Sequence, residues 1–225
     1  NRLKEILGEA FLAARKTLGK GVHVFTQLDF HPEYGFGSSA TLISLLSQWL
    51  EFNAFELHHA LFGGSGYDIS CATAKGPILY SLKNREPQEI PVHFYPDFHD
   101  QLYFVYLGQK QRSDTEVARF KKNASFSPMH IDKITALTHE ILKANSLTIM
   151  EDTLKEHEQL MSHILQRPTI QSERFKNYHG VVKSLGAWGG DFVLVTTQKT
   201  EAEFGKEMKE RGFDIVYSFE QLVLR

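Results

Sequence analysis

The chain contains 225 residues, of which 42% are hydrophobic and 23% are charged, and its formal net charge is −2. This balance is ordinary for a soluble globular protein with a buried core, and it gives no electrostatic basis for binding nucleic acid or an anionic membrane. A single cysteine, Cys71, excludes an intrachain disulfide framework and favours a reducing, cytoplasmic setting, while no apolar run approaches the roughly 20 residues that span a bilayer.

Hydrophobic periodicity predicts a mixed succession of helices and strands. The predicted elements are, in chain order, a helix at 2–17, a strand at 22–30, helices at 38–50 and 54–61, a short helix at 67–74, strands at 77–82, 90–95 and 102–107, helices between 113 and 167, strands at 181–185 and 192–197, a helix at 201–211 and a strand at 213–217. Polar loops are predicted near 83–91 and 167–173. Because strands and helices do not alternate regularly, the order favours an α+β fold over a doubly wound sheet. The change from strands to helices predicts two domains, 1–110 and 111–225.

Glycine and serine crowd the start of the helix predicted at 38–50, where residues 29–41 read DFHPEYGFGSSAT. Gly35 and Gly37 allow a positive φ and the close approach of a ligand, and the first turn of a helix offers unpaired N–H groups and a partial positive charge. Together these features are typical of an anion site, most often for phosphate. Because capping alone would need one serine, the pair Ser38 and Ser39 favours phosphate binding over an ordinary helix cap.

Two common phosphate-binding motifs fit this stretch poorly. The P-loop requires a lysine directly after its last glycine, whereas Ser38 follows Gly37 here. The dinucleotide-binding pattern G-x-G-x-x-G/A is satisfied at 35–40, but an acidic residue about 20 positions further on should then end a strand. Glu56 has the distance and lies in a helical pattern, so the dinucleotide interpretation is weak.

A third pattern fits better, because PEYGFGSSA at 32–40 resembles the phosphate loop of the GHMP kinases, the family of galactokinase, homoserine kinase, mevalonate kinase and phosphomevalonate kinase. Two further segments resemble motifs of the same family, in the same order. GGSGYD at 63–68 is similar to P-S-G-x-D with Gly64 in place of the proline, and KSLGAWGGD at 183–191 is similar to the glycine-rich C-terminal motif with Trp188 in place of a glycine. GYDIS at 66–70 is closest to a bacterial subgroup named for its Gly-Tyr-Asp-Ile-Ala segment.

The resemblance implies a GHMP kinase-like two-domain α+β fold, with a ribosomal-protein-like N-terminal domain and a ferredoxin-like C-terminal domain, and it implies ATP and Mg²⁺ as cofactors. In that picture Ser39 contacts Mg²⁺, Glu56 is a second ligand one position out of register, and Asp68 faces the acceptor hydroxyl as the catalytic residue. The residues implied in nucleotide binding are Gly35, Gly37, Ser38, Ser39, Ala40, Gly186, Gly189 and Gly190. Since the family's first motif does not occur in this sequence, the N-terminal domain is predicted to be incomplete, in a fragment or in a shortened homologue.

Two positions leave alternatives open. Asp68 follows a tight turn at a predicted helix N-terminus, where N–H groups hold a carboxylate ionised and ready to accept a hydroxyl proton; the simpler interpretation is a helix cap. Trp188 would narrow the space that closes over the phosphates, or stack on a ligand ring. The simpler interpretation of Trp188 is a buried side chain in a glycine-rich hairpin.

We therefore predict an ATP- and Mg²⁺-dependent kinase of the cytoplasm that phosphorylates a hydroxyl of a small metabolite, mevalonate-like or sugar-like. A non-catalytic nucleotide-binding or regulatory protein of the same fold is one alternative, suggested by Trp188 and the absent first motif. An assembly or interaction domain that keeps its glycines only for turns is another. A small-molecule substrate is the expected partner, neither nucleic acid nor a membrane is expected, and a homodimer stays open.

Overall fold

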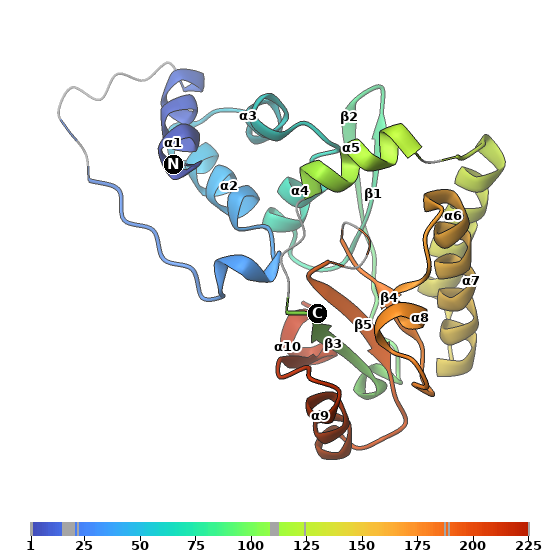
Figure 1. Ribbon diagram of the computed structural model, residues 1–225. Coiled ribbons are helices and arrows are strands. Elements are labelled where there is room, and N and C mark those ends of the chain that lie inside the picture. Colours follow the sequence, from blue (N-terminus) through green and yellow to red (C-terminus); the bar gives the residue numbers. More distant parts are fainter. Residues whose placement is uncertain are drawn as a thin grey trace. The chain divides into compact units, whose positions relative to one another are not determined.

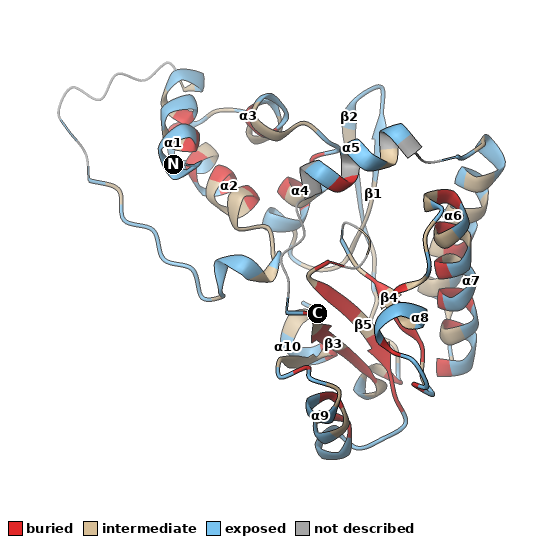
Figure 2. Cartoon of the chain, viewed as in Figure 1, coloured by how far each residue is buried: buried red, intermediate tan, exposed pale blue. Residues whose placement is uncertain are grey.

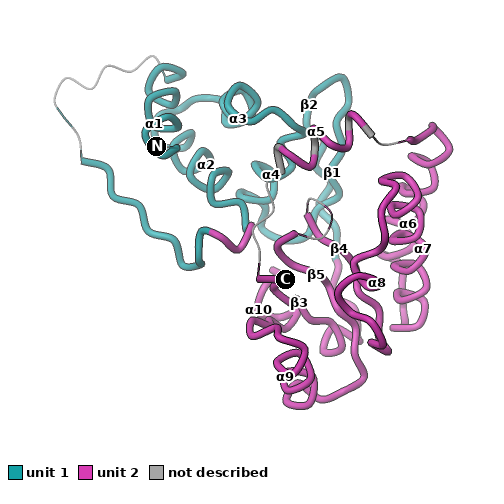
Figure 3. The backbone as a smooth tube through the Cα atoms, viewed as in Figure 1, with its two compact units in different colours: residues 1–32, 36–93 teal, residues 33–35, 94–225 magenta. Residues whose placement is uncertain are grey.

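The structure is a computed structural model, and it describes residues 2–14, 21, 23–108, 113–123, 125–186, 188 and 190–224. The chain divides into two compact units (Figure 3). Unit 1 comprises Asn1–Pro32 and Phe36–His93, and unit 2 comprises Glu33–Gly35 and Phe94–Arg225. The chain therefore changes units after His93, ahead of the boundary near 110 that the sequence suggests. The assignment of 1–110 and 111–225 to the two domains of the family stays a prediction.

Unit 1 is built of helices followed by one hairpin (Figure 1). Its elements are α1 (Arg2–Ala13), α2 (Ser38–Leu50), α3 (Ala54–Phe62), α4 (Tyr67–Thr73), β1 (Ile78–Lys83) and β2 (Glu86–Pro91), and the 3₁₀ turn η1 (Pro32–Tyr34) spans the change of units. The helices bury one apolar cluster, which consists of Ile6, Ala10, Ala40, Ile43, Leu46, Leu50, Leu57 and Ile69. Since α2 packs against both α1 and α4, it is the central helix of this unit.

The strand predicted at 22–30 is wrong for its described part. Residues 23–30 form no strand, and Phe25 is 80% exposed. An isolated strand is not stable without a partner that pairs with its backbone, and no strand in the described part of the chain pairs with this segment.

The hairpin corrects a second prediction. β1 and β2 are antiparallel, and Lys83 lies opposite Glu86. Between them Asn84 and Arg85 both have positive φ, 54° and 67°, which is the geometry of a type I′ two-residue turn. The turn therefore starts the second strand at Glu86, four residues before the predicted start at 90, and the stretch predicted as a polar loop is mostly strand.

Unit 2 contains an antiparallel four-stranded sheet with the strand order β4-β5-β3-β6. The strands are β3 (Leu102–Tyr106), β4 (Val182–Ser184), β5 (Phe192–Thr196) and β6 (Val216–Ser218). The other elements are η2 (His99–Gln101), α5 (Ser113–Asn123), α6 (Pro128–Lys143), α7 (Leu147–Leu165), α8 (Ile170–Arg174), α9 (Glu201–Glu210) and α10 (Phe219–Leu222). With α5–α8 between the first two strands and α9 between the last two, this is the βαββαβ order of a ferredoxin-like unit.

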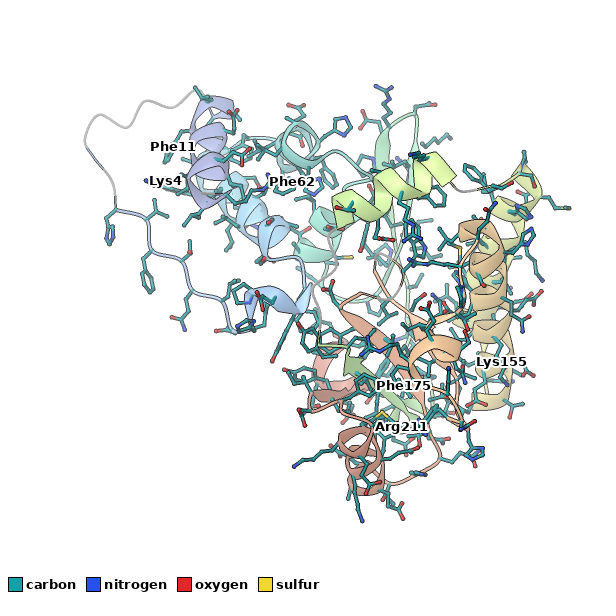
Figure 4. All side chains as sticks on the ribbon, viewed as in Figure 1. Lys4, Phe11, Phe62, Lys155, Phe175 and Arg211 are labelled. Atoms are coloured by element: carbon teal, nitrogen blue, oxygen red, sulfur yellow. The ribbon has the colours of Figure 1, made fainter. Side chains whose placement is uncertain are left out.

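Alternation along the strands buries both faces of the sheet, and buried positions run along β3 and β5 (Figure 2). Tyr103 and Val105 belong to the same cluster as Phe204 of α9, whereas Phe104 packs against the cluster that holds Phe219 of α10. This period of two is what a strand covered on both sides requires. Figure 4 shows the contrast with the helix surfaces, since Phe175 lies inside the unit and the exposed Lys155 lies on the outside of α7.

One short helix, α8, was not predicted from the sequence. The stretch predicted as a polar loop at 167–173 contains most of α8, which follows Pro168 and begins after Thr169. The Thr169 Oγ1 caps the helix by accepting a hydrogen bond from the Ser172 N–H at 3.3 Å. Five residues are too few to give a readable helical period. Over the part of the chain that the structure describes, no helix is long and apolar enough to cross a membrane.

Candidate functional site

The first glycine-rich segment opens helix α2 with an uncapped first turn. Gly37 is the N-cap residue, with φ 76° in the left-handed region, and no side chain caps the turn that follows. Ser38 and Ser39 are half-buried, and Ala40 is buried at 2% exposure. The first N–H groups of a helix have no partner inside the helix, so this turn has the donors and the positive end of a helix dipole that suit an anion.

The other glycine of this segment is held in unit 2. Gly35 has φ 71°, and a Cβ built on it would lie 2.8 Å from the Cβ of Asp191 and closer still to the Asp191 carboxyl group. The ring of the neighbouring Tyr34 packs 5.1 Å from that of Tyr106 and 5.9 Å from that of Phe192. Only glycine fits at position 35, and the first and third motifs therefore meet at Gly35 and Asp191.

The second segment is a turn that starts helix α4. Gly66 is the N-cap residue with φ 77°, and a Cβ there would lie 3.0 Å from Cδ1 of Phe55. The Tyr80 hydroxyl of strand β1 donates to the Ser65 carbonyl oxygen at 2.5 Å, which holds the turn from the other side. Asp68 lies in the first turn of the helix that follows.

The electrostatics of Asp68 differ from the prediction. Burial raises the pKa of the Asp68 carboxyl above its usual value, because desolvation outweighs the opposing effects of His58 and of a backbone N–H. The backbone hydrogen bond expected from the sequence does lower the pKa of Asp68, but burial raises this pKa by more. The pKa of His58 is lowered, again mainly by burial. A carboxylate with a raised pKa is a better proton acceptor than an ordinary aspartate.

Both of these helix starts belong to unit 1. Helix α2 packs against α4, and Ala40, in the first turn of α2, shares a buried cluster with Ile69, which follows Asp68. The structure thus places the uncapped turn of the first motif and the carboxylate of the second motif on two helices of one core.

Glu56, predicted as a second Mg²⁺ ligand, lies exposed in the first turn of α3. Its carboxylate accepts a hydrogen bond from Nδ2 of Asn53 at 3.2 Å, while the Asn53 side chain accepts from the N–H groups of Phe55 and Glu56. This arrangement caps the helix. Among the described residues, no three His, Cys, Asp or Glu side chains are grouped as metal ligands. The pair Ser39 and Glu56 as Mg²⁺ ligands stays a prediction.

The third segment begins on a buried ion pair in unit 2. The Lys183 ammonium lies 3.1 Å from the Glu158 carboxylate of α7, and the Ser184 Oγ donates to the same carboxylate at 2.7 Å. Both partners are largely buried, with side-chain exposures of 14% and 8%. Lys183, matched to the family motif by sequence, therefore faces α7. Of the predicted nucleotide-binding glycines here, Gly186 is exposed with φ 56° and Gly190 is buried, while Gly189 lies outside the described residues.

Trp188 has a backbone conformation that glycine adopts more readily than other residues. Its φ is 60°, in the left-handed region that side chains disfavour. The indole stacks on Phe120 of α5, with ring centroids 5.1 Å apart and planes 16° apart, and the Trp188 carbonyl oxygen accepts a hydrogen bond from the Arg167 guanidinium. The indole therefore stacks on a side chain of its own chain.

The sequence missed the residues that hold this loop. Arg167 also pairs with Glu116 of α5 at 3.1 Å. Arg167 therefore links α5 to the Trp188 carbonyl, in addition to the direct contact of Trp188 with Phe120. Neither Glu116 nor Arg167 belongs to a motif, and 51 residues separate them. The one local signal is that Arg167 stands between the end of α7 and Pro168, where chain direction changes.

Comparisons with known proteins identify the fold. No family model and no curated protein sequence matches the chain. Among solved structures, a Lin0012 protein from Listeria innocua is similar with a TM-score of 0.61 and 17% identity, over 82% of this chain and 68% of that one. L. major mevalonate kinase, solved in complex with R-mevalonate, is similar with a TM-score of 0.57 and 18% identity, over 82% of this chain and 64% of that one.

The protein is thus an α+β protein with a fold similar to that of a GHMP kinase, as the three motifs predicted. At identities of 17% and 18% the likeness shows the fold alone. The narrower assignment to the bacterial subgroup with the Gly-Tyr-Asp-Ile-Ala segment stays a prediction.

Proposed function

We propose that the protein is an ATP- and Mg²⁺-dependent kinase, which transfers a phosphoryl group to a hydroxyl of a small metabolite, mevalonate-like or sugar-like. One observation carries the proposal: the uncapped, glycine-opened turn of α2 and the half-buried Asp68 of α4 belong to helices of the same core. Their occurrence in a fold similar to that of mevalonate kinase supports it.

The residues of unit 1 suit the reaction class. Phosphoryl transfer needs positioning and charge neutralisation more than covalent catalysis. The N–H groups of Ser38, Ser39 and Ala40 are donors for phosphate oxygens at the positive end of the helix dipole, and the Ser39 hydroxyl and Glu56 would hold the metal. Mg²⁺, when bound, neutralises charge on the phosphates.

Asp68 would act on the acceptor. As the acceptor oxygen forms its bond to the γ-phosphorus and the bond to the bridging oxygen breaks, ADP leaves and the hydroxyl proton passes to the Asp68 carboxylate. Burial raises the pKa of that carboxyl, which favours proton uptake. Tyr80 would act as a positioning residue, because its hydroxyl fixes the turn before Asp68.

Binding is tested by the thermal shift of the protein with ATP and MgCl₂, compared with ATP and EDTA. We expect ATP to raise the Tm only when Mg²⁺ is present, and we expect this shift to be smaller in Ser39→Ala. Ser47→Ala is the matched control, because Ser47 lies near the other end of α2, where its hydroxyl donates to the Ser44 carbonyl. Absence of any shift with a folded protein would contradict the proposal and favour the assembly or interaction domain.

Turnover is tested by ADP release against a panel of mevalonate-like acids, sugars and amino-alcohols. Binding without turnover on any acceptor would favour a non-catalytic nucleotide-binding or regulatory protein. A specific observation supports that second candidate: Trp188 fills, with a stacked indole, a position at which the family motif has glycine.

A further inference from the structure

A pocket of about 180 Å³ lies entirely within unit 2. Its walls come from the C-terminal half of α7, from the turn that leads into α8, from α8 itself, from β4 and from the loop of the third segment. The lining residues used below are Glu158, Arg167, Thr169, Glu173, Arg174 and Trp188. None of them belongs to the proposed phosphoryl-transfer site of unit 1.

Among the charged residues around the pocket, Arg174 has hydrogen-bond donors that no other described residue uses. Glu158 is neutralised by Lys183 at 3.1 Å, and Arg167 is neutralised by Glu116 at 3.1 Å. Arg174 has no ion pair among the described residues, and its one hydrogen bond there runs from Nη2 to the Leu107 carbonyl oxygen at 3.3 Å. A guanidinium carries five N–H donors, so most of the Arg174 donors are left for a ligand.

The remaining polar groups point to the same kind of ligand. The Thr169 Oγ1 accepts from the Ser172 N–H, which leaves its hydroxyl proton as a donor. Glu173 and Arg174 are both exposed at the pocket, so solvent screens the charge of each of them. The unused donors of Arg174 indicate the ligand, because a planar or tetrahedral oxyanion is the group that an arginine fork binds best.

We propose that this pocket binds a small metabolite through one oxyanion, a phosphate or a carboxylate, held by Arg174 with Thr169. Trp188 forms part of the wall, and Arg167 both lines the pocket and binds the Trp188 carbonyl. Occupation of the pocket is therefore sensed by the indole of the third glycine-rich segment.

The indole provides the measurement. The chain has two tryptophans, so Trp49→Phe leaves Trp188 as the single fluorophore. Without nucleotide, this variant is titrated with inorganic phosphate, with succinate and with KCl at matched ionic strength, and calorimetry repeats each titration. We expect saturable binding and a fluorescence change with phosphate or with succinate, which identifies the oxyanion, and none with KCl.

The arginine is tested in the same background. Arg174→Gln should weaken binding about tenfold to hundredfold, as expected for hydrogen bonds to a charged group, and Arg174→Lys should weaken it less. Lys155→Gln, an exposed lysine on α7, should leave it unchanged. Because Arg174 also lies over the Phe213 ring, the Tm of each variant is measured first.

Three outcomes would overturn the inference: no saturable binding by either method, unchanged affinity in folded Arg174→Gln, or phosphate binding that is lost only in Ser38→Ala. The last would assign the anion to α2. Because the titrations contain no ATP, failure of the kinase proposal and failure of this pocket are separate results.

Discussion

The first two glycine-rich segments and the third each contain a residue with positive φ, but the surroundings of that residue differ. At Gly37 and Gly66, a glycine with positive φ starts a helix and offers no side chain to cap the first turn. In α4 the Ser65 hydroxyl, one residue before the N-cap, accepts a hydrogen bond from the Tyr67 N–H at 3.4 Å. At Trp188 the φ is also positive, at 60°, but the side chain fills the space beside it and stacks on Phe120. A positive φ therefore occurs both where glycine leaves space beside the backbone and where a large side chain fills it.

This difference separates what each segment can do. The helix starts of unit 1 supply backbone N–H groups and the half-buried carboxylate of Asp68. The third segment is held by contacts of its own chain, from Lys183 to Glu158 and from Arg167 to the Trp188 carbonyl. We infer that the first two segments serve the proposed phosphoryl transfer, and that the third supports the wall of the pocket of unit 2. A nucleotide-binding role for Gly186, Gly189 and Gly190 stays a prediction.

The largest expected effect comes from Asp68→Asn. Loss of a proton acceptor should lower turnover by about 10²- to 10⁴-fold, measured as ADP release on the best acceptor. The same variant should be more stable at neutral pH. Burial raises the pKa of Asp68, so stability from this group is present below its ordinary pKa and is lost as pH rises through the raised one; asparagine avoids that loss.

The control for Asp68 is Asp97→Asn, an exposed aspartate of unit 2, which should change neither turnover nor Tm. Turnover that survives in Asp68→Asn would remove Asp68 from the mechanism, and an unchanged Tm at neutral pH would show that its carboxyl is not desolvated.

Gly35→Ala tests the meeting of the first and third motifs. The new Cβ would clash with Asp191 at a residue with φ 71°, and overpacking together with left-handed strain should cost roughly 2–4 kcal/mol. Thermal unfolding should show a Tm lower by roughly 5–15 °C. Asp191→Gly in the same chain should recover part of the loss. Gly8→Ala, in α1 with open space around it, should be neutral or slightly stabilising, and equal effects at both glycines would refute the close approach.

His157, next to Glu158 in α7, should make the stability of the folded protein depend on pH. Burial, with help from Lys183, lowers its pKa to about 4, and its Nδ1 is buried without a partner among the described residues. As the pH falls below the ordinary pKa of 6.5, His157 becomes protonated in the unfolded chain, whereas in the folded chain it stays neutral down to about pH 4. Stability should therefore fall across this window, by at most about 1.4 kcal/mol per pH unit.

Urea unfolding between pH 7 and pH 4 measures this effect. His157→Phe should flatten the profile, whereas the exposed His139→Gln should leave it unchanged. A profile that is identical in both variants would show that His157 is not the group responsible.

The smallest effect is expected at Trp188. In Trp188→Gly, loss of the stack on Phe120 costs about 0.5–1.5 kcal/mol beyond the lost burial, while relief of left-handed strain returns about 1–2 kcal/mol. Trp188→Ala loses the stack and keeps the strain. The glycine variant should thus be more stable than the alanine variant by about 1–2 kcal/mol in urea unfolding. Equal stabilities would mean that the backbone relaxes when the indole is removed.

Local signals in the sequence were sufficient where packing agreed with them. Helix α2 begins at Ser38 and ends at Leu50, as predicted, because its glycine start and its apolar face specify the same element. The strand predicted at 22–30 has the right alternation, but alternation does not supply a pairing partner. The turn at Asn84 and Arg85 set the register of the hairpin, and an arginine with positive φ is not a turn signal that a sequence displays.

The candidate site was predicted in part for the same reason. The glycines and Asp68 stand out because their roles depend on local backbone geometry. The desolvation of Asp68 and the pair of Arg167 with Glu116 depend on which distant segments pack together. Sequence spacing carries no record of those contacts, and the pocket of unit 2 was therefore invisible before the fold was known.

The placement of residues 33–35 in unit 2 has a consequence for dissecting the protein. A fragment that starts at Phe94 would lack Tyr34, and the rings of Tyr106 and Phe192 on which Tyr34 packs would be exposed to water. The two units cannot be separated by a single cut of the chain. A short peptide carrying the Tyr34 segment, supplied alongside the fragment, would restore the missing aromatic cover.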